Sequence, residues 1–484
     1  MRWADLTIIV IYLAGITWFG ARFRHSQRSL KDYFLGGRTA PWWAIALSIV
    51  SAETSTLTVI GTPALSFNGN FGFLQVVLGY LLARIVISTL FLPAYFRGEM
   101  FTAYELMRVR FGERIRKLTA GTFLVLRTLA EGVRVFAISI VISIVLGTGE
   151  MTSIVVILIL TLIYTYEGGM TAVIWTDVLQ MILYVAGAVI SLIAVLGQID
   201  GGWRHVVEFA GPLGHFQIFD FRASPDMQFF SRAYSFWGGV IGGCFLTTAS
   251  HGTEQLIVQR LLAARSEQQS RLALLTSWGV IFVQFTLFLV VGVCLFTLYA
   301  DRGWNTPEVT DSIYPRFIWE QLPVGVAGLV IAAILAAAMS NLSAALNALA
   351  STTVMDFLRP MMGTKGGDEA LWLRRARWAT VAWGAVLLGV ALLARHWGGV
   401  LEAGLGIASI IYGSLLGVFL LGLLTRRVGE VGAMCGMAAG LVVMLYVRFF
   451  TPIHWTWYVL IGTSVTFLTG VVVSLVMVQT DKSA

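Results

Sequence analysis

The sequence is dominated by apolar runs that are each long enough to cross a membrane as a helix. They are typically about 18 to 26 residues long, which suits the roughly 30 Å of hydrocarbon that a transmembrane helix must span. They lack the regular alternation of an outer-membrane barrel. A mean hydropathy of +0.80, with 57% hydrophobic and only 12% charged residues, excludes an ordinary soluble globule. We therefore expect an all-α, polytopic membrane protein.

The ends of the apolar runs predict about thirteen transmembrane helices. The predicted spans lie near residues 5–23, 41–66, 73–96, 118–147, 151–166, 171–197, 232–258, 272–299, 322–354, 376–394, 399–424, 430–449 and 456–478. The longest segments between them are 198–231, 300–321 and 356–375. Each is too short to fold around a core of its own, so one membrane domain accounts for the chain.

Basic residues in the loops set the expected orientation, because short cytoplasmic loops carry an excess of Lys and Arg. They gather in four loops on one side of the membrane: Arg22, Arg24, Arg28, Lys31 and Arg38; Arg97, Arg108, Arg110, Arg114, Arg116 and Lys117; Arg260, Arg265 and Arg271; and Arg359, Lys365, Arg374, Arg375 and Arg377. This distribution predicts an outer N-terminus and a cytoplasmic C-terminus in the cell (inner or plasma) membrane. The net charge of +7 reflects this topology, and the separate loops form no face for a nucleic acid.

Two polar interruptions stand out within the predicted spans. Glu53 lies in the polar run Ser51–Thr56, where a membrane helix should meet hydrocarbon. A charge at that depth costs roughly 2.5 to 3.5 kcal/mol on insertion scales, so it normally faces a site or a water-filled cavity. A comparable run, Thr247–Gln255, interrupts the seventh span. Transporters built from inverted repeats have discontinuous helices at corresponding positions of their halves, with substrate and ion sites beside the breaks.

The ninth span carries a third polar feature. Ser340, Ser343 and Asn347 are spaced i, i+3 and i+7, so they share one helix face. Hydroxyl and amide oxygens, with carbonyls exposed by a broken helix, suit a small hard cation. The alternative is that small polar residues only hold helices together. Combined with two broken helices, the pattern favours an ion site.

Other charges within the spans allow two interpretations each. Arg84 lies near the centre of the third span, and Arg127, Glu131 and Arg134 lie along one face of the fourth. Glu131 can pair with either arginine, which predicts a structural ion cluster. Alternatively, Arg134 faces a central cavity and holds an anionic substrate bidentately. Asp177, at the start of the sixth span, is explained by helix capping, with a role in cation exit as the alternative.

Together these segments resemble the sodium/solute symporter family, which includes sodium/glucose, proline, iodide and monocarboxylate cotransporters. The resemblance covers about residues 33–424 and rests on the order of several motifs. The motifs are Tyr33–Arg38, Phe91–Pro93, Thr102–Leu106, Arg110–Phe111, Glu167–Asp177, Val258–Arg260, Asn347–Ala350 and Gly413–Gly417.

The resemblance implies a LeuT-type fold with two inverted five-helix repeats, residues 41–197 and 232–424, joined by the extracellular loop 198–231. Residues 1–40 would add an N-terminal helix and a cytoplasmic loop, and residues 425–484 would add two C-terminal helices.

The family's sodium site also maps onto this chain. The implied ligands are the backbone carbonyls of Ser51, Thr54 and Ala337 and the side-chain oxygens of Ser340 and Asn341. Family members usually have a hydroxyl residue where Asn341 stands, although an amide oxygen can also coordinate sodium.

Several acidic residues match family positions as well. Glu53 stands where the proline branch has an aspartate important for sodium use, and Asp177 matches an acidic residue linked to intracellular sodium release. Glu254 and Gln255 match a pair close to the substrate. Ile281 replaces the lysine that helps bind galactose in a sugar-transporting relative, which argues against galactose-like recognition.

We therefore expect a sodium-coupled symporter that imports a small organic solute, such as a sugar, a sialic acid or a monocarboxylate, by alternating access. It would act as a monomer in the lipid bilayer and not as an enzyme, since the sequence shows no paired nucleophile and base. The substrate would bind near Ser55, Thr58, Gln75, Arg134, Glu254 and Gln255. Two alternatives stay open: coupling to H⁺, because Glu53 and Glu254 are titratable, and a solute sensor with the same fold that transports nothing.

Overall fold

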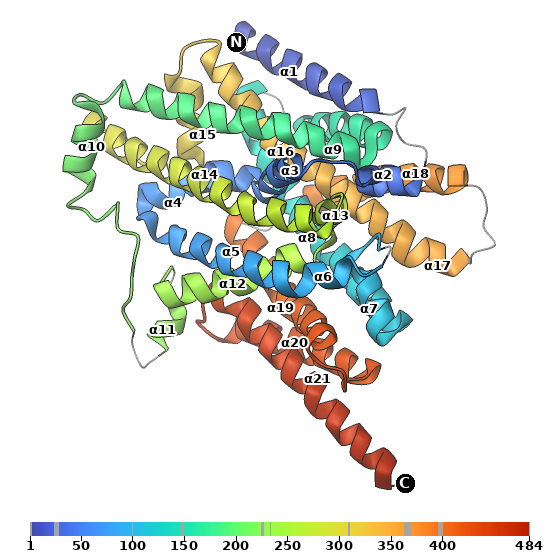
Figure 1. The fold of residues 1–484 in the computed structure, drawn as a ribbon. Coiled ribbons are helices and arrows are strands. Elements are labelled where there is room, and N and C mark those ends of the chain that lie inside the picture. Colours follow the sequence, from blue (N-terminus) through green and yellow to red (C-terminus); the bar gives the residue numbers. More distant parts are fainter. Residues whose placement is uncertain are drawn as a thin grey trace.

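The computed structural model is built from helices that run side by side through the molecule, as the sequence predicts (Figure 1). It describes residues 2–23, 29–98, 100–146, 150–223, 227–232, 234–307, 310–362, 369–394 and 400–483. Parts of two predicted basic loops, residues 24–28 and 363–368, lie outside the described residues. Eight described helices are long and apolar enough to cross a membrane, and the bent pair α3–α4 makes a ninth span.

The helices have the following bounds. The first part of the chain forms α1 (Trp3–Ala21), α2 (Leu30–Leu35), α3 (Trp42–Glu53), α4 (Thr56–Asn68), α5 (Leu74–Val86), α6 (Leu92–Tyr95), α7 (Ala103–Phe111), α8 (Glu113–Leu146), α9 (Glu150–Leu196) and α10 (Gly202–Ala210). The second part forms α11 (Gln228–Ser231), α12 (Phe236–Gly252), α13 (Gln255–Leu262), α14 (Glu267–Arg302), α15 (Ile313–Gln321), α16 (Val326–Thr352), α17 (Arg359–Met362), α18 (Glu369–Ala394), α19 (Val400–Leu424), α20 (Glu430–Phe450) and α21 (Tyr458–Ser483).

Helix α9 contains two of the predicted spans, residues 151–166 and 171–197. The backbone is non-helical at Gly169, with φ 53° and ψ −150°, so the chain turns there between two helical parts. A positive φ of this kind is readily adopted only by glycine. Asp177 therefore lies within the second helical part.

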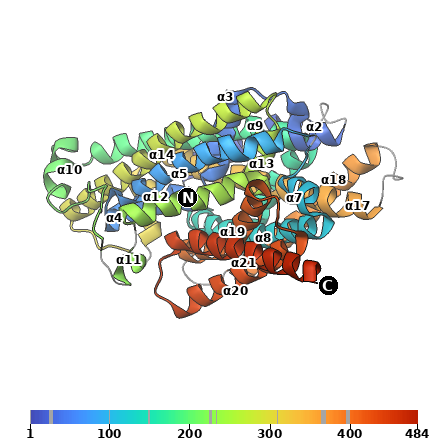
Figure 2. The ribbon, with the colours of Figure 1, turned by 60° about the horizontal axis from the view of Figure 1, so that its bottom comes forward.

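Helix α16 lies at the centre of the molecule. In its most apolar window 94% of the residues are buried, against 22% for α1. It packs against α1, α3, α8 and α9, and its alanines Ala336, Ala337 and Ala338 are all buried. Small side chains of this kind let helices approach closely in a membrane. Figure 1 shows α1 at one edge of the bundle, and Figures 1 and 2 show α20 and α21, packed on α19, at another edge.

The pairing of α5 with α12 depends on glycine. A Cβ atom on Gly79 would lie 2.3 Å from the carbonyl oxygen of Val240, and one on Gly243 would lie 2.3 Å from that of Val76. The two backbones thus touch, which holds the third predicted span against the seventh.

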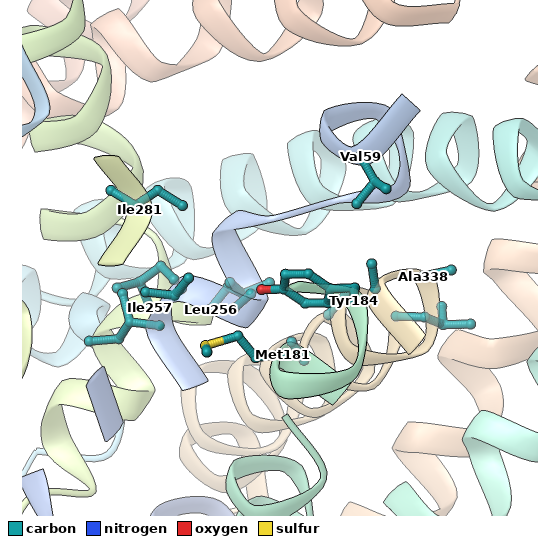
Figure 3. Close-up of a cluster of buried hydrophobic side chains, with 14 of the residues drawn as sticks. Val59, Met181, Tyr184, Leu256, Ile257, Ile281 and Ala338 are labelled. Carbon is teal, nitrogen blue, oxygen red and sulfur yellow. The ribbon is translucent and has the colours of Figure 1, made fainter. Parts of the chain in front are cut away.

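Apolar side chains close around the break between α3 and α4. Figure 3 shows Val59 of α4 together with Met181 and Tyr184 of α9 and Ile281 of α14. Leu256 and Ile257 of α13 belong to the same group of buried side chains.

Candidate functional site

The second predicted span is broken where the sequence places its polar interruption. α3 ends at Glu53, α4 begins at Thr56, and the two helices are bent by 65°. Ser55 caps α4: its hydroxyl accepts from the Thr58 amide at 3.4 Å, and the Thr58 hydroxyl accepts from the Ser55 amide at 3.3 Å. Because the Ser55 amide is used in this way, it does not close the last turn of α3 onto the carbonyl of Ser51. The break frees a backbone oxygen inside the membrane.

The seventh span is also interrupted: α12 ends at Gly252 and α13 begins at Gln255. Glu254 precedes α13, and its carboxylate makes no capping hydrogen bond to that helix. The carboxylate instead accepts from Arg127 of α8 at 3.1 Å and from the hydroxyl of Tyr412 of α19. The second break therefore directs an acidic side chain toward two other helices.

A cavity of about 180 Å³ is lined by residues from both breaks. Five of the residues predicted to form the site line it: Glu53, Ser55, Thr58, Arg134 and Glu254. Several lining residues also line a second cavity, which reaches Asn68 and Asn70 at the end of α4. The central cavity therefore extends toward that end of the bundle.

Two residues predicted to contact the substrate do not line the cavity. Gln75 donates from Nε2 to the carbonyl of Tyr234 at 2.6 Å and accepts at Oε1 from the amide of Asp220 at 3.0 Å. Gln255 accepts from the amide of Ala103 at 2.8 Å. Its Nε2 donates to the carbonyl of Phe101 at 2.9 Å and to the hydroxyl of Ser351 at 3.3 Å. Both glutamine side chains are thus engaged mostly by backbone groups, so they brace neighbouring segments.

Glu53 is paired with a second buried charge. Its carboxylate accepts from Nη2 of Arg84 at 2.6 Å, and Nε2 of His251 lies 3.3 Å from the same oxygen. Arg84 is fully buried and also donates to the hydroxyl of Ser277 at 3.1 Å. The two opposite charges compensate each other, which explains how both persist at this depth.

A group of charges on α8 forms the predicted ion cluster and extends it by one residue. Glu131 accepts from Arg127 at 2.9 Å and from Arg134 at 3.2 Å, while Arg127 also pairs with Glu254 at 3.1 Å. We call these four residues the α8 ion cluster. The side chain of Arg134 is 27% exposed, against 4% for Arg127, and it lines the cavity. The two interpretations of Arg134, ion pairing and cavity lining, are thus compatible.

The oxygen-rich face of α16 meets α3 and α9. The hydroxyls of Ser340 and Ser51 are 2.6 Å apart, and Ser340 donates to Oδ1 of Asp177 at 2.7 Å. The other carboxylate oxygen of Asp177 accepts from Arg260 at 2.8 Å and from the hydroxyl of Ser48. Asp177 is fully buried inside α9. The capping interpretation of Asp177 is therefore wrong, because the helix begins well before this residue.

The resemblance implies three more sodium ligands close to Ser340. Two of them, Thr54 and Ala337, belong to the same region, whereas the side-chain oxygen of Asn341 points toward other residues. Thr54 is fully buried at the break, and Ala337 is fully buried on α16, one turn before Asn341. The side-chain oxygen of Asn341 accepts from Arg127 at 2.9 Å and from Arg134 at 3.1 Å. It therefore faces the α8 ion cluster.

The sequence does not predict the three tyrosines of the cavity wall: Tyr80, Tyr234 and Tyr412. Tyrosine in an apolar helix or its flank is common in cores and interfaces, so the sequence carries no signal that separates these residues from packing residues. Only the arrangement of α5, α12 and α19 brings them together.

Comparison with known proteins places this geometry in a family. The sequence profile of the sodium:solute symporter family matches residues 33–440, which include both breaks and the Ser340 face. The human sodium/iodide cotransporter is 29% identical over 453 residues, covering 91% of this chain and 68% of the human protein. The mouse sodium-coupled monocarboxylate transporter 1 is 30% identical over 426 residues, covering 87% of this chain and 68% of the mouse protein.

Solved structures agree on the fold. A Na⁺-coupled sialic acid symporter in a substrate-bound outward-open state matches with a TM-score of 0.88 and 24% identity, covering 98% of this chain and 97% of that one. A nucleobase-cation-symport-1 family transporter matches with a TM-score of 0.60 and 14% identity, covering 90% and 92%. The expected LeuT-type fold is confirmed. With both breaks, the cavity and the sequence profile in agreement, the chain belongs to the sodium:solute symporter family and is a sodium-coupled symporter of a small solute.

Proposed function

We propose that this protein imports a small organic anion together with sodium, and that the anionic group of the solute binds Arg134 in the central cavity. The position of Arg134 carries this proposal. Its side chain lines the cavity, and its hydrogen bonds to Glu131 and Asn341 both use Nη1. Within the described part of the chain Nη2 makes no hydrogen bond, so its donors are available to a carboxylate, for which guanidinium geometry is well matched.

Charge balance supports a solute of this kind. The α8 ion cluster contains two arginines and two glutamates, and Glu53 is compensated by Arg84. A cation or an anion that entered alone would leave an uncompensated charge in a poorly solvated site, which is costly. One sodium ion and one monoanion that bind together keep the site neutral.

The relatives support the same solute class. Iodide and monocarboxylates, named in the two curated relatives, are anions, and so is the sialic acid named in the structural neighbour. A neutral sugar carries no anionic group to pair with the Nη2 donors of Arg134.

Sodium would bind where α3 breaks beside α16. The ligands would be the carbonyls of Ser51, Thr54 and Ala337 and the hydroxyl of Ser340. The freed carbonyl of Ser51 and the short contact between the Ser51 and Ser340 hydroxyls support this place, because both provide hard oxygen donors. Asp177, which accepts from Ser340, would receive the ion on its way to the cytoplasm.

Proton coupling has less support. Glu53 is held by Arg84, and Glu254 is held by Arg127. Either carboxylate could take up a proton only by breaking a buried ion pair, which would leave its arginine uncompensated. The ion-pairing of both residues therefore favours sodium as the coupling ion.

The transport cycle would follow from the repeats 41–197 and 232–424, which would rock against each other around the cavity. We place the N-terminus outside and the C-terminus in the cytoplasm of a cell-membrane protein that acts as a monomer. Sodium would then enter down its gradient, with each charge contributing about 2.3 kcal/mol per 100 mV.

Uptake into proteoliposomes tests this proposal. Labelled pyruvate, lactate, N-acetylneuraminate and iodide would be offered with an inward sodium gradient, an inward proton gradient or neither, with glucose as the neutral control. We expect at least one of the three carboxylates to accumulate only with sodium, and we expect Arg134→Gln to abolish that accumulation. Accumulation of glucose alone would overturn the anion assignment, accumulation driven by protons alone would overturn sodium coupling, and no accumulation under any gradient would favour a solute sensor.

A further inference from the structure

Asn341 makes contacts in two directions from the centre of α16. It is 2% exposed, and its Nδ2 donates to the carbonyl of Ala52 at 2.8 Å, in the last turn of α3. Its Oδ1 accepts from Nη2 of Arg127 at 2.9 Å and from Nη1 of Arg134 at 3.1 Å. One side chain therefore joins the broken helix to both arginines of the α8 ion cluster.

The surroundings fix the orientation of this amide. In the opposite orientation, the NH₂ group of Asn341 would face two guanidinium groups and its oxygen would face the carbonyl oxygen of Ala52. Neither arrangement would form a hydrogen bond. The orientation with Oδ1 toward the arginines is thus the only one that satisfies all three partners. A donor then points toward α3, and a donor cannot coordinate a cation.

We propose that Asn341 is a positioning residue that couples the sodium site to the solute site, and that it is not itself a sodium ligand. Arg134 is held at Nη1 by only two hydrogen bonds in the described chain, one to Glu131 and one to Asn341. A serine hydroxyl at this position would lie closer to α16 and would not span both contacts. The amide reaches from the Ala52 carbonyl to the arginines because it carries a donor and an acceptor on one rigid plane.

This arrangement gives a physical route for coupling. Sodium bound to the carbonyls of Ser51 and Thr54 would fix the segment that carries Ala52. Because Asn341 is hydrogen-bonded to both Ala52 and Arg134, fixing Ala52 also holds the guanidinium of Arg134 in place before the anion arrives. Coupling of this kind is reciprocal: an anion on Arg134 would tighten sodium by the same factor. The inference rests on the proposed function for the identity of the two ligands, but the contact of Asn341 with Arg134 does not.

The test uses the purified full chain in detergent and needs no known solute. Phenylglyoxal labels arginine side chains, and mass spectrometry of the Arg134 peptide gives the labelling rate in sodium chloride or in choline chloride of equal ionic strength. We expect Asn341→Leu and Asn341→Ser to raise the rate at Arg134 about tenfold, the effect of losing one hydrogen bond to a charged group. In the wild type, sodium should slow this labelling.

Asn341→Asp separates the two contacts of the amide. A carboxylate can still accept from the arginines but cannot donate to the Ala52 carbonyl. We expect Arg134 to remain as protected as in the wild type in choline chloride, while the slowing by sodium disappears. If sodium still slows labelling in Asn341→Asp, the link through Ala52 is refuted.

The sodium-dependent shift of the melting temperature distinguishes positioning from ligation, because a ligand that binds only the folded state stabilises it. Ser340→Ala should reduce the shift strongly, whereas Asn341→Leu and Asn341→Ser should keep it. A loss of the shift in the Asn341 variants as large as in Ser340→Ala would make Asn341 a sodium ligand and overturn the inference, as would unchanged labelling of Arg134. No shift in the wild type would count against the proposed sodium site instead, and the labelling in choline chloride would still decide the role of Asn341.

Discussion

Glu53 keeps its charge inside the membrane because Arg84 lies 2.6 Å away. The sequence predicts that such a carboxylate matters, since its insertion is costly, but it does not predict the partner. The two residues are 31 positions apart on different helices, and helical periodicity relates only near neighbours. The contacts among Arg127, Glu131 and Arg134 were predictable because these residues are three or four positions apart on one helix. The contact of Arg127 with Glu254 was not predictable, because Glu254 lies far away in the sequence.

The Glu53–Arg84 pair should behave as a unit. Arg84→Met removes the arginine partner of a buried carboxylate and should destabilise the protein by about 3–5 kcal/mol. Adding Glu53→Gln to that variant should recover much of the lost stability. Thermal unfolding in detergent measures both effects. Arg204→Met, which breaks an exposed pair with Glu208, is the control and should cost about 1 kcal/mol or less. Additive losses from the two buried substitutions would contradict the pairing.

Arg134→Lys tests the geometry of anion binding. Lysine keeps the positive charge but cannot offer two parallel donors, so we expect the KM for the accumulated anion to rise about tenfold or more. The sodium-dependent shift of the melting temperature should stay unchanged, because the sodium site lies on other residues. Initial uptake rates over a range of solute concentrations give the KM, and an unchanged KM would argue that the solute binds elsewhere in the cavity.

At the scale of the helix, the two breaks were predictable and the course of α9 was only partly so. Runs of Ser and Thr beside an acidic residue marked both breaks, because these side chains compete with the helical hydrogen bonds. Asp177 was misinterpreted as a cap because the sequence does not show where this helical part begins, and the break at Gly169 places its start well before Asp177. The engagement of Gln75 and Gln255 by backbone groups also depends on loops whose paths the sequence does not reveal.

Helix α14 offers a matched pair of glycines for testing helix packing. A Cβ on Gly292 would lie 2.1 Å from the carbonyl oxygen of Pro63 in α4, whereas one on Gly279 would meet nothing within 4 Å. Gly292→Ala should therefore destabilise the protein by about 1–3 kcal/mol. Gly279→Ala should be neutral or stabilising by up to about 1 kcal/mol. Melting temperatures in detergent compare the two, and equal effects would mean that α4 and α14 do not pack this closely.

At the scale of the whole molecule, the LeuT-type fold was predicted through the resemblance to a family, which rests on the order of short motifs over about residues 33–424. The cavity wall is less predictable, because it draws residues from many helices and includes tyrosines without any motif. Charge connects these scales: the described charges around the cavity are paired, and Arg134 keeps its Nη2 donors for a solute. Sodium and an anion should therefore bind together and cross the membrane together.

The most direct test of this claim is the influx of radioactive sodium into proteoliposomes, measured with and without an external anion that the protein accumulates. We predict that the anion increases sodium influx in the wild type, that glucose does not, and that the increase is lost in Arg134→Gln. Sodium influx that is the same with and without the accumulated anion would contradict the account, because the two fluxes would then not be coupled.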